Sequence, residues 1–466
     1  MTAHNPGFRS LDSEVHDYRP EIEGTIPEWL SGTLVRNGPG QFEAGDEGVT
    51  HWFDGLAMLR RYAFEDGTLR YSNRFLRSDA YANATAGRLT GQFGTDTRGA
   101  GRLFDVLRSF GPPEPTDNAN VHVARLGGEY VALTEAPRRM AFDPETLETR
   151  GEFTFADDLT EHLTSAHLVD DPHRGEQVGF ATQFGRTPRY HVYRVLDGER
   201  GRDVVASVEA RGPAYVHDCS VTADHVVLVE PPLVLPMRRV LDPFSEGPID
   251  MLDWQPERGT RVLVVNRDTG ELVADPTLDA AFTFHHINAF VDDGTVTVDL
   301  VEFPDAGIVD AMRMDRLDDG FPDVPDGRPV RYRIDPERNA VQRSVLHDCG
   351  MELPRVARAD VGRRYRYAYG QATHHEGANG LVKLDCESRT TREWWEPSVY
   401  VEEPIPLRRP EATTEDDGVV VAPALDAEQE RTVLLVFDAA TLDVRARAVL
   451  PHAEPFGFHG RFFPEV

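Results

Sequence analysis

Short runs of alternating apolar and polar residues, each about the length of a β-strand, dominate the chain. Four examples are VHVARL at 121–126, VVLVEPPLVL at 226–235, TVTVDLVEF at 295–303 and RTVLLVFD at 431–438. Runs of this length that are rich in β-branched residues are typical of strands, and apolar residues at helical spacing are scarce. The pattern therefore predicts an all-β protein.

A turn that contains an aspartate close after an apolar residue recurs between these runs. The aspartates are Asp66, Asp143, Asp197, Asp268, Asp335, Asp385 and Asp438. Aspartate suits such turns because its carboxylate accepts hydrogen bonds from nearby backbone N–H groups. Seven hairpin tips predict seven four-stranded blades around a central channel, a β-propeller. Their irregular spacing leaves open a two-domain protein of unrelated hairpins, and 466 residues would suit either fold.

One segment, GRLFDVLRSFGPPEP at 101–115, departs from the strand pattern. Its apolar residues are Leu103, Phe104, Val106, Leu107 and Phe110. At helical spacing they form a wide apolar face that ends at a glycine and two prolines. The face would either pack into the core or remain exposed and dip into a membrane surface beside a substrate entrance. The pattern alone favours neither interpretation.

The charge of the chain is extreme, with 79 acidic residues against 49 basic ones and a formal net charge of −30. Lys383 is the only lysine. A nucleic-acid-binding protein carries the opposite sign, so nucleic acid is excluded as a partner. The self-repulsion would be screened at molar salt, where the Debye length falls to about 3 Å. We therefore expect a halophilic archaeon as the source, although a GC-rich genome would also favour arginine over lysine.

The remaining composition predicts a soluble, cytoplasmic protein. Three scattered cysteines are too few for a disulfide framework. Residues 1–20 lack the apolar core of a signal peptide. No stretch approaches the roughly 18 to 20 apolar residues that span a bilayer.

Four histidines far apart in the sequence each fall at an expected strand end or turn: His167, His217, His285 and His459. They can meet only if the fold brings every part of the chain to one axis. Neutral imidazoles gathered there would form an all-nitrogen metal site with no carboxylate or thiolate. Such a donor set suits iron, although imidazole also binds zinc, copper and nickel.

Several longer motifs surround these histidines. They are GTIPEWLSGTLVRNGPGQF at 24–42, HWFDGLAML at 51–59, TDNANV at 116–121, FHHINAF at 284–290, RYRYAYG at 364–370 and FGFHGRF at 456–462. On these motifs and their order, nearly the whole chain resembles the carotenoid cleavage oxygenases. The resemblance extends to the animal branch, which contains the β-carotene oxygenases and the retinal pigment epithelium isomerohydrolase.

The resemblance implies one domain over residues 1–466, a seven-bladed β-propeller with a helical and loop cap over an axial metal site. It also implies one Fe²⁺ per chain, bound by His167, His217, His285 and His459. His285 is preferred to His286 because the family motif places its ligand three residues before the asparagine of FHHINAF. Adjacent strand residues face opposite ways, so His286 should point elsewhere.

Three glutamates match the family's supporting carboxylates, namely Glu135, Glu352 and Glu403. A carboxylate that accepts the far ring N–H of a ligating imidazole sets its tautomer and orientation. Glu403, directly before a proline, is preferred to its neighbour Glu402.

Other histidines need no metal in this interpretation. We expect His51 in HWFDG to be structural. His374 and His375 are assigned to a surface loop, because adjacent residues rarely bind one ion together.

The activity implied is a dioxygenase reaction without an organic cofactor and without catalytic residues separate from the metal centre. Both atoms of O2 add across one C=C bond of a carotenoid or apocarotenoid, and two carbonyl products leave. Conversion of β-carotene to retinal is the specific candidate. The apolar segment matches the position of the family's membrane-contacting segment, so Leu103, Phe104, Leu107 and Phe110 are expected to contact the inner face of the cell membrane peripherally.

Three alternatives remain. The isomerohydrolase relative uses the same iron scaffold without oxygen on a retinyl ester. Some relatives cleave stilbenoid phenols with the help of a lysine, which is disfavoured in this chain because Lys383 lies in a predicted outer hairpin strand. A non-catalytic propeller would leave the four histidines and three glutamates unexplained.

Overall fold

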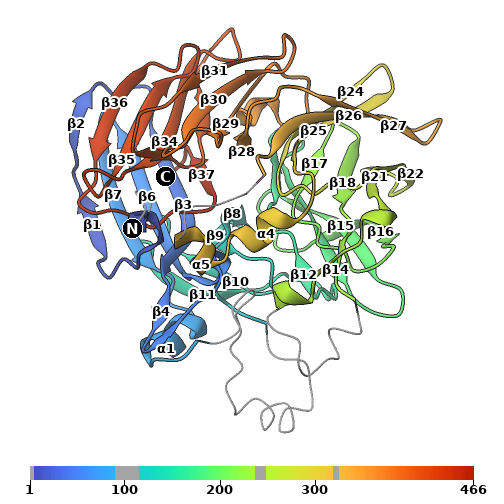
Figure 1. The fold of residues 1–466 in the computed structure, drawn as a ribbon, viewed down its shortest axis with the longest axis horizontal. Helices are drawn as coiled ribbons and strands as arrows, with labels where there is room; N and C mark the ends of the chain where they lie inside the picture. Colours follow the sequence, from blue (N-terminus) through green and yellow to red (C-terminus); the bar gives the residue numbers. More distant parts are fainter. Residues whose placement is uncertain (1–4, 90–114, 237–247, 319–324) are drawn as a thin grey trace.

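Seven antiparallel sheets surround one axis in the computed structural model, which describes residues 5–89, 115–236, 248–318 and 325–466 (Figure 1). The predicted seven-bladed β-propeller is thereby confirmed. The apolar segment at 101–115 lies outside the described residues except for its last residue, Pro115.

Each of the first four blades is a sheet of four or five strands. The first blade contains β37 (Gly460–Phe463), β3 (Gly32–Gln41), β6 (Leu56–Glu65), β7 (Thr68–Phe75) and β1 (Val15–Tyr18). The second contains β8 (His122–Leu126), β9 (Glu129–Leu133), β10 (Arg139–Phe142) and β11 (Thr149–Phe153). The third contains β12 (Leu163–Thr164), β13 (Val169–Asp171), β14 (Glu176–Gln183), β15 (Arg189–Leu196) and β16 (Asp203–Glu209). The fourth contains β17 (Cys219–Val221), β18 (His225–Glu230), β21 (Thr260–Asn266), β22 (Leu272–Ala274) and β23 (Thr277–Leu278).

The last three blades complete the ring. The fifth contains β24 (His286–Asp292), β25 (Thr295–Glu302), β26 (Arg328–Asp335) and β27 (Ala340–Val345). The sixth contains β28 (Met351–Arg355), β29 (Tyr367–Ala372), β30 (Gly380–Asp385) and β31 (Thr390–Trp394). The seventh contains β32 (Val399–Val401), β33 (Ile405–Arg408), β34 (Gly418–Asp426), β35 (Arg431–Asp438), β36 (Val444–Val449) and β2 (Glu21–Gly24).

Both ends of the chain close the ring. The C-terminal strand β37 pairs with β3 of the first blade, and the early strand β2 pairs with β36 of the last. The N-terminal and C-terminal segments accordingly lie side by side, blue against red, in Figure 1. Two independent seams mean that strands at both ends of the sequence must be in place before the axis is complete.

The seven predicted turns occupy one structural position, between the third strand of each blade and the next strand outward. In three of them, at Asp143, Asp385 and Asp438, the carboxylate accepts backbone N–H groups two and three residues ahead at 2.9–3.0 Å. In the fourth blade Asn266 performs this capping. The assignment of that cap to Asp268 was wrong, because the asparagine two residues earlier offers the same acceptor oxygen.

The core lies between neighbouring sheets. Val227 and Val264 of the fourth blade, for example, pack with Val298 and Tyr332 of the fifth. All four residues of the run 226–229 are buried, although strict alternation would expose every second one. The middle strands of a blade are covered on both faces by adjacent blades, so their sequence is continuously apolar. Burial of this kind contributes roughly 25 cal/mol per Å² of apolar surface.

Short helices and small sheets supplement the blades. They are η1 (Asn5–Phe8), η2 (Trp52–Asp54), α1 (Asp79–Thr85), η3 (Pro248–Met251), η4 (Pro256–Arg258), α4 (Gly307–Ala311), α5 (Met314–Asp318), η5 (Arg358–Asp360), and the two-stranded sheets β4 (Glu43–Ala44) with β5 (Glu47–Gly48) and β19 (Leu233–Val234) with β20 (Asp253–Trp254). Figure 1 shows α4 and α5 near the middle of the ring, where the predicted cap was expected. None of the helices in the described ranges has the length and hydropathy needed to cross a bilayer.

Candidate metal centre

Four histidines reach the propeller axis because each stands at the beginning of an innermost strand. His285 and His459 directly precede β24 and β37, and His217 lies two residues before β17. His167 occupies the short break between β12 and β13. The blades that supply them are the first, third, fourth and fifth. Strand starts of different blades converge on the axis, so residues almost 300 positions apart become neighbours.

The four side chains form one buried cluster, with exposed fractions of 4–8%. Their potential ligand atoms lie within 4.8 Å of one another. The Nε2 atoms of His167 and His217 are 3.0 Å apart, and the ring centroids of His167 and His459 are 4.3 Å apart. Two imidazole nitrogens bound at about 2.1 Å and at right angles to each other around an ion would be about 3.0 Å apart. The spacing therefore fits a shared metal ion.

The electrostatics of the cluster also fit a cation. Burial and the neighbouring histidines hold the pKa of His167 well below its ordinary value, and burial lowers the pKa of His459 to about 3. These rings are neutral and offer lone pairs near physiological pH. Nε2 of His285 is buried and has no hydrogen-bond partner among the residues that the structure describes. An unsatisfied buried nitrogen is costly, and coordination to a metal would satisfy it.

Three glutamates bind the outer nitrogens of three of these rings. The Nδ1 atoms of His217, His285 and His459 donate to Glu135 at 2.6 Å, Glu352 at 2.5 Å and Glu403 at 2.8 Å. This directs each Nε2 lone pair inward, the arrangement found around metal-ligating histidines. Among the described residues no carboxylate is bonded to the ring of His167.

Glu352 determines the proton affinity of His285. Burial of that imidazole opposes protonation, but the charge and hydrogen bond of Glu352 raise its pKa above the ordinary value. The backbone beside Glu352 is unusual, because Leu353 has a φ of 48° and the register with β29 shifts between Glu352 and Arg355. In a regular strand residues three apart face opposite ways, whereas this bulge directs both Glu352 and Arg355 toward the axial cluster.

His286 and Glu402, the sequence neighbours of His285 and Glu403, have other partners. His286 directs Nδ1 to the Ser220 hydroxyl at 2.8 Å. Glu402 forms a buried ion pair with Arg36 at 3.0 Å and accepts the Gly457 N–H. Both have partners of their own outside the four-histidine cluster.

Two residues that the sequence reasoning missed complete the axis. His122, the first residue of β8, stacks on His459 with ring centroids 5.4 Å apart. Arg355 donates to Nε2 of His122 at 3.0 Å and pairs with Glu403 at 2.7 Å. Burial, followed by the charge of Arg355, holds the pKa of His122 well below its ordinary value. With these two residues and Glu403, all seven blades contribute to the centre. His122 begins the innermost strand β8 and Arg355 ends the innermost strand β28.

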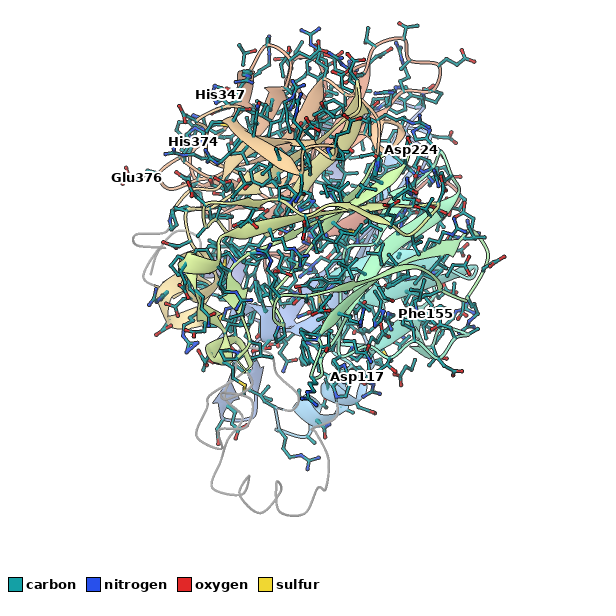
Figure 2. All side chains as sticks on the ribbon, turned by 90° about the vertical axis from the view of Figure 1, so that its right-hand side faces the viewer. Asp117, Phe155, Asp224, His347, His374 and Glu376 are labelled. Atoms are coloured by element: carbon teal, nitrogen blue, oxygen red, sulfur yellow. The ribbon has the colours of Figure 1, made fainter. Side chains whose placement is uncertain are left out.

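Three other residues of interest lie away from the axis. Lys383 is in β30, the third strand of its blade, where Asp416 binds its ammonium at 2.7 Å. His374 and His375 lie in the loop after β29, and Figure 2 shows His374 at the margin of the molecule. They belong to a separate group with Glu393.

Aromatic rings form a wall beside the histidines. Phe284 contacts the ring of His217 edge-on at 5.2 Å, and Phe53 lies between Phe284 and Phe458 at 6.2 and 5.8 Å. Trp52 packs on Phe458 at 4.7 Å. Such a wall excludes water and offers apolar faces to a bound molecule.

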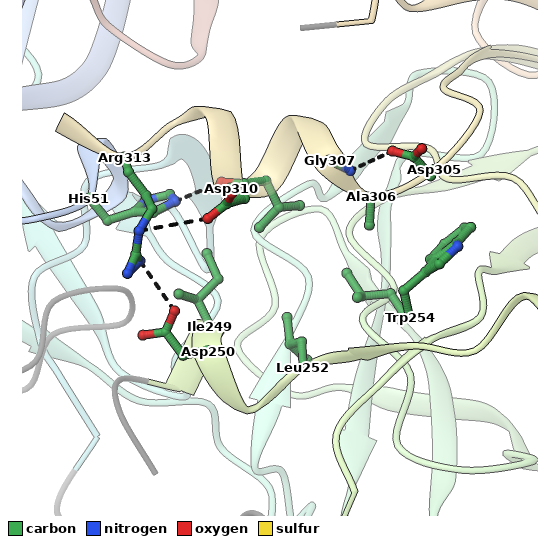
Figure 3. A pocket seen from close by; sticks show the side chains of 12 residues that line it. His51, Ile249, Asp250, Leu252, Trp254, Asp305, Ala306, Gly307, Asp310 and Arg313 are labelled. Atoms are coloured by element: carbon green, nitrogen blue, oxygen red, sulfur yellow. Dashed lines mark hydrogen bonds and ion pairs between the residues drawn. The ribbon is translucent and has the colours of Figure 1, made fainter. Parts of the chain in front are cut away.

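A cavity of about 440 Å³ lies under α4 (Figure 3). Leu252 and Trp254 line one part, and His51, Asp310 and Arg313 line another. His51 is fully buried, and its Nε2 lies 3.0 Å from the Val309 carbonyl, which fits the structural role expected for it.

Hydrogen bonds connect one lining residue of the cavity with a carboxylate beside His217. Its lining residue Leu233 accepts the Tyr215 N–H at 2.8 Å. The Tyr215 hydroxyl in turn donates to Glu135 at 3.0 Å.

A seven-bladed propeller with four histidines and three supporting carboxylates on its axis defines a class of metalloprotein. The family model described as "Retinal pigment epithelial membrane protein" matches residues 8–464. The chain belongs to this family, the carotenoid cleavage oxygenases, and is an enzyme.

Individual relatives agree over most of the chain. Carotenoid cleavage dioxygenase 8 of Arabidopsis thaliana is 32% identical, with 98% of this chain and 85% of the relative covered. Carotenoid isomerooxygenase of Galleria mellonella is also 32% identical, with 98% and 96% covered. The solved structure of the cobalt-substituted apocarotenoid oxygenase of Synechocystis superposes with a TM-score of 0.87 at 27% identity, covering 99% of this chain and 98% of the other.

Proposed function

We propose that the enzyme is a non-haem Fe²⁺ dioxygenase that cleaves one C=C bond of a carotenoid or apocarotenoid. The observation that carries this proposal is the buried cluster of four imidazoles without a carboxylate or thiolate among the inner ligands. Nitrogen-only sites of this kind suit a redox-active divalent ion. The names of the relatives, which include carotenoid cleavage dioxygenases, support a polyene substrate.

In this proposal each part of the centre has a defined task. His167, His217, His285 and His459 hold the ion, and the glutamates keep three of the rings in position. Bound Fe²⁺ supplies O2 activation. The aromatic wall contacts the polyene and keeps water away, so the double bond next to the centre is selected by shape. One alkene and one O2 yield two carbonyl compounds, which balances every atom without another reductant.

The test is anaerobic reconstitution with Fe²⁺ followed by β-carotene and ¹⁸O2, at molar salt because of the net charge of −30. Two molecules of retinal, each carrying one ¹⁸O, are expected if the central bond is cut. Labelled aldehydes of other lengths would support the dioxygenase reaction but show that another double bond is cleaved. Unlabelled products, or cleavage of a retinyl ester without oxygen, would contradict the proposal and favour the isomerohydrolase reaction.

We also propose that the cavity under α4 is part of the path of the substrate. The apolar part of its lining, which includes Leu233, Leu252 and Trp254, suits a polyene, and hydrogen bonds link Leu233 through Tyr215 to Glu135 beside His217. Leu252→Trp should raise KM by about 10-fold, the order expected when a binding pocket is narrowed. Iron content should stay unchanged. An unaltered KM would place the path elsewhere.

Peripheral membrane contact remains a proposal that rests on the sequence pattern at 103–110. A carotenoid partitions into bilayers, and an anionic surface would repel this acidic protein less as salt screens the charges. Flotation with anionic liposomes should therefore increase with salt and be lost in Phe104→Asp with Leu107→Asp. Flotation that is independent of salt and survives both changes would contradict it.

A further inference from the structure

A second group of metal-binding side chains lies on the sixth blade, apart from the axis. His374 and His375 are in the loop 373–379 between β29 and β30, and Glu393 is in the outermost strand β31. Ala372 at the end of β29 pairs with Met351 at the start of β28. The loop is therefore on the same face of the propeller as Glu352.

The geometry of this group matches coordination. Nε2 of His374 and Nε2 of His375 lie 3.2 and 3.1 Å from the same oxygen, Oε2 of Glu393. Nitrogen and oxygen ligands bound at about 2.1 Å around a tetrahedral Zn²⁺ are about 3.4 Å apart. The three potential ligand atoms all lie within 4.8 Å of one another.

The orientation of the two rings directs a nitrogen of each toward the carboxylate. Nδ1 of His374 faces the Gly350 carbonyl at 3.4 Å, and its Nε2 faces Oε2 of Glu393. The rings of His374 and His375 lie side by side with centroids 4.3 Å apart. Both Nε2 atoms and the carboxylate oxygen therefore converge on one point, where a single ion could contact all three.

The loop holds the two rings on one side. In a strand, adjacent residues would face opposite ways. In this loop the rings are tilted by only 34° to each other, and His375 stacks on Trp395 with centroids 5.1 Å apart. Thr373 anchors the loop start by donating to Asp326 at 2.8 Å. The loop and its contacts thus hold both rings toward Glu393.

We propose that His374, His375 and Glu393 form a Zn²⁺ site that fastens this loop to β31, with water as the fourth ligand. The side chains are 17–33% exposed, which leaves room for that water. Two imidazoles and one carboxylate are an established zinc donor set. The buried Cys349 is not part of this group.

The direct test is calorimetric titration of the iron-loaded enzyme with ZnCl2, in molar salt and excess Mg²⁺ so that surface carboxylates are occupied. One saturable Zn²⁺ site is expected, weakened at least about 10-fold by Glu393→Gln and by His375→Ala. A His16→Ala, His173→Ala variant removes two histidines elsewhere and should bind as the parent does. The absence of a saturable site, or equal binding in all variants, would overturn the proposal.

Trp395 provides an independent local reporter. Cu²⁺, which favours the same ligands, should quench tryptophan emission in the iron-loaded enzyme, and Trp395→Phe should lose most of that quenching. Equal quenching in Trp395→Phe would contradict a site at this position. The Glu393→Gln variant should retain as much iron and consume oxygen as fast as the parent does. Failure of the zinc site is therefore distinguishable from failure of the proposed dioxygenase function.

Discussion

The axis and the outer turns of this propeller both contain carboxylate–arginine pairs, but the carboxylates have different partners and different burial. At both places a carboxylate near a strand end pairs with an arginine. Asp385 pairs with Arg366 at 2.8 Å and caps backbone N–H groups of its own turn. Glu403 pairs with Arg355 at 2.7 Å but supports His459, which is 56 residues away.

The two carboxylates differ in how deeply they are buried. The Glu403 side chain is 1% exposed and that of Asp385 is 13% exposed. A buried charge must be compensated completely, because its desolvation amounts to several kcal/mol. The outer turns are therefore local and replaceable, as Asn266 illustrates in the fourth blade. The axis depends on contributions from all the blades together.

Removal of an axial histidine should have the largest effect. His285→Ala is expected to weaken iron binding by more than the roughly 10- to 100-fold that loss of a supporting hydrogen bond causes, and to abolish cleavage. His286→Ala is the matched control, because His286 bonds to Ser220 instead. Metal analysis after gel filtration should find iron in the control only. Iron retained by His285→Ala would remove that residue from the ligand set.

Removal of Arg355 should mainly affect stability. Arg355→Met leaves Glu403 buried beside a neutral His459, which is expected to lower the free energy of unfolding of the iron-free protein by about 3 kcal/mol. Bound iron restores positive charge near Glu403, so loading should raise Tm more in the variant than in the parent. Differential scanning calorimetry with and without Fe²⁺ measures both. An equal rise in both proteins would show that Arg355 does not balance that charge.

Loss of one supporting carboxylate should weaken the centre without destroying it. Glu352→Gln removes the charge that raises the pKa of His285 and is expected to weaken iron binding by about 10- to 100-fold. Glu402→Gln should instead lower stability through Arg36 and leave iron affinity unchanged. Competition with a coloured Fe²⁺ chelator compares the two. Similar affinities would argue against a supporting role for Glu352.

A substitution in an outer turn should have the smallest effect on stability. Burial alone would raise the pKa of Asp385. The hydrogen bonds from Arg366 and from the N–H groups of the turn outweigh burial and lower this pKa to about 2. Its stabilising contribution is fully present above the ordinary value near 3.8 and is lost as pH falls toward 2. Asp385→Ala should cost less than about 1 kcal/mol at pH 7 and almost nothing at pH 2. Urea unfolding at several pH values measures the difference, and a larger loss at low pH would contradict the predicted sign.

The blades were predictable from local features, because a β-hairpin and its turn are encoded within about twenty residues. The seven aspartate turns marked one hairpin per blade, even where Asn266 rather than Asp268 proved to be the cap. The four histidines and three glutamates were predicted from family motifs, and the structure brings them together. Their role as iron ligands and supports stays a prediction.

His122 and Arg355 could not be predicted, for physical reasons. Arg355 reaches the axis only because the bulge after Glu352 reverses the facing of the strand. His122 belongs to the cluster through the start of β8, and no sequence spacing relates it to His459. Convergence at an axis depends on the closed ring, which periodicity along one strand does not encode. Which double bond of the substrate is cleaved depends on the tertiary structure in the same way.

The most direct test of the central claim is X-ray absorption at the iron edge of the reconstituted enzyme. Four imidazole nitrogens at about 2.1 Å, with no sulfur and no protein carboxylate oxygen, are expected in the parent and in His286→Ala. An inner shell with fewer imidazoles, or one that His286→Ala changes, would contradict the four-histidine centre.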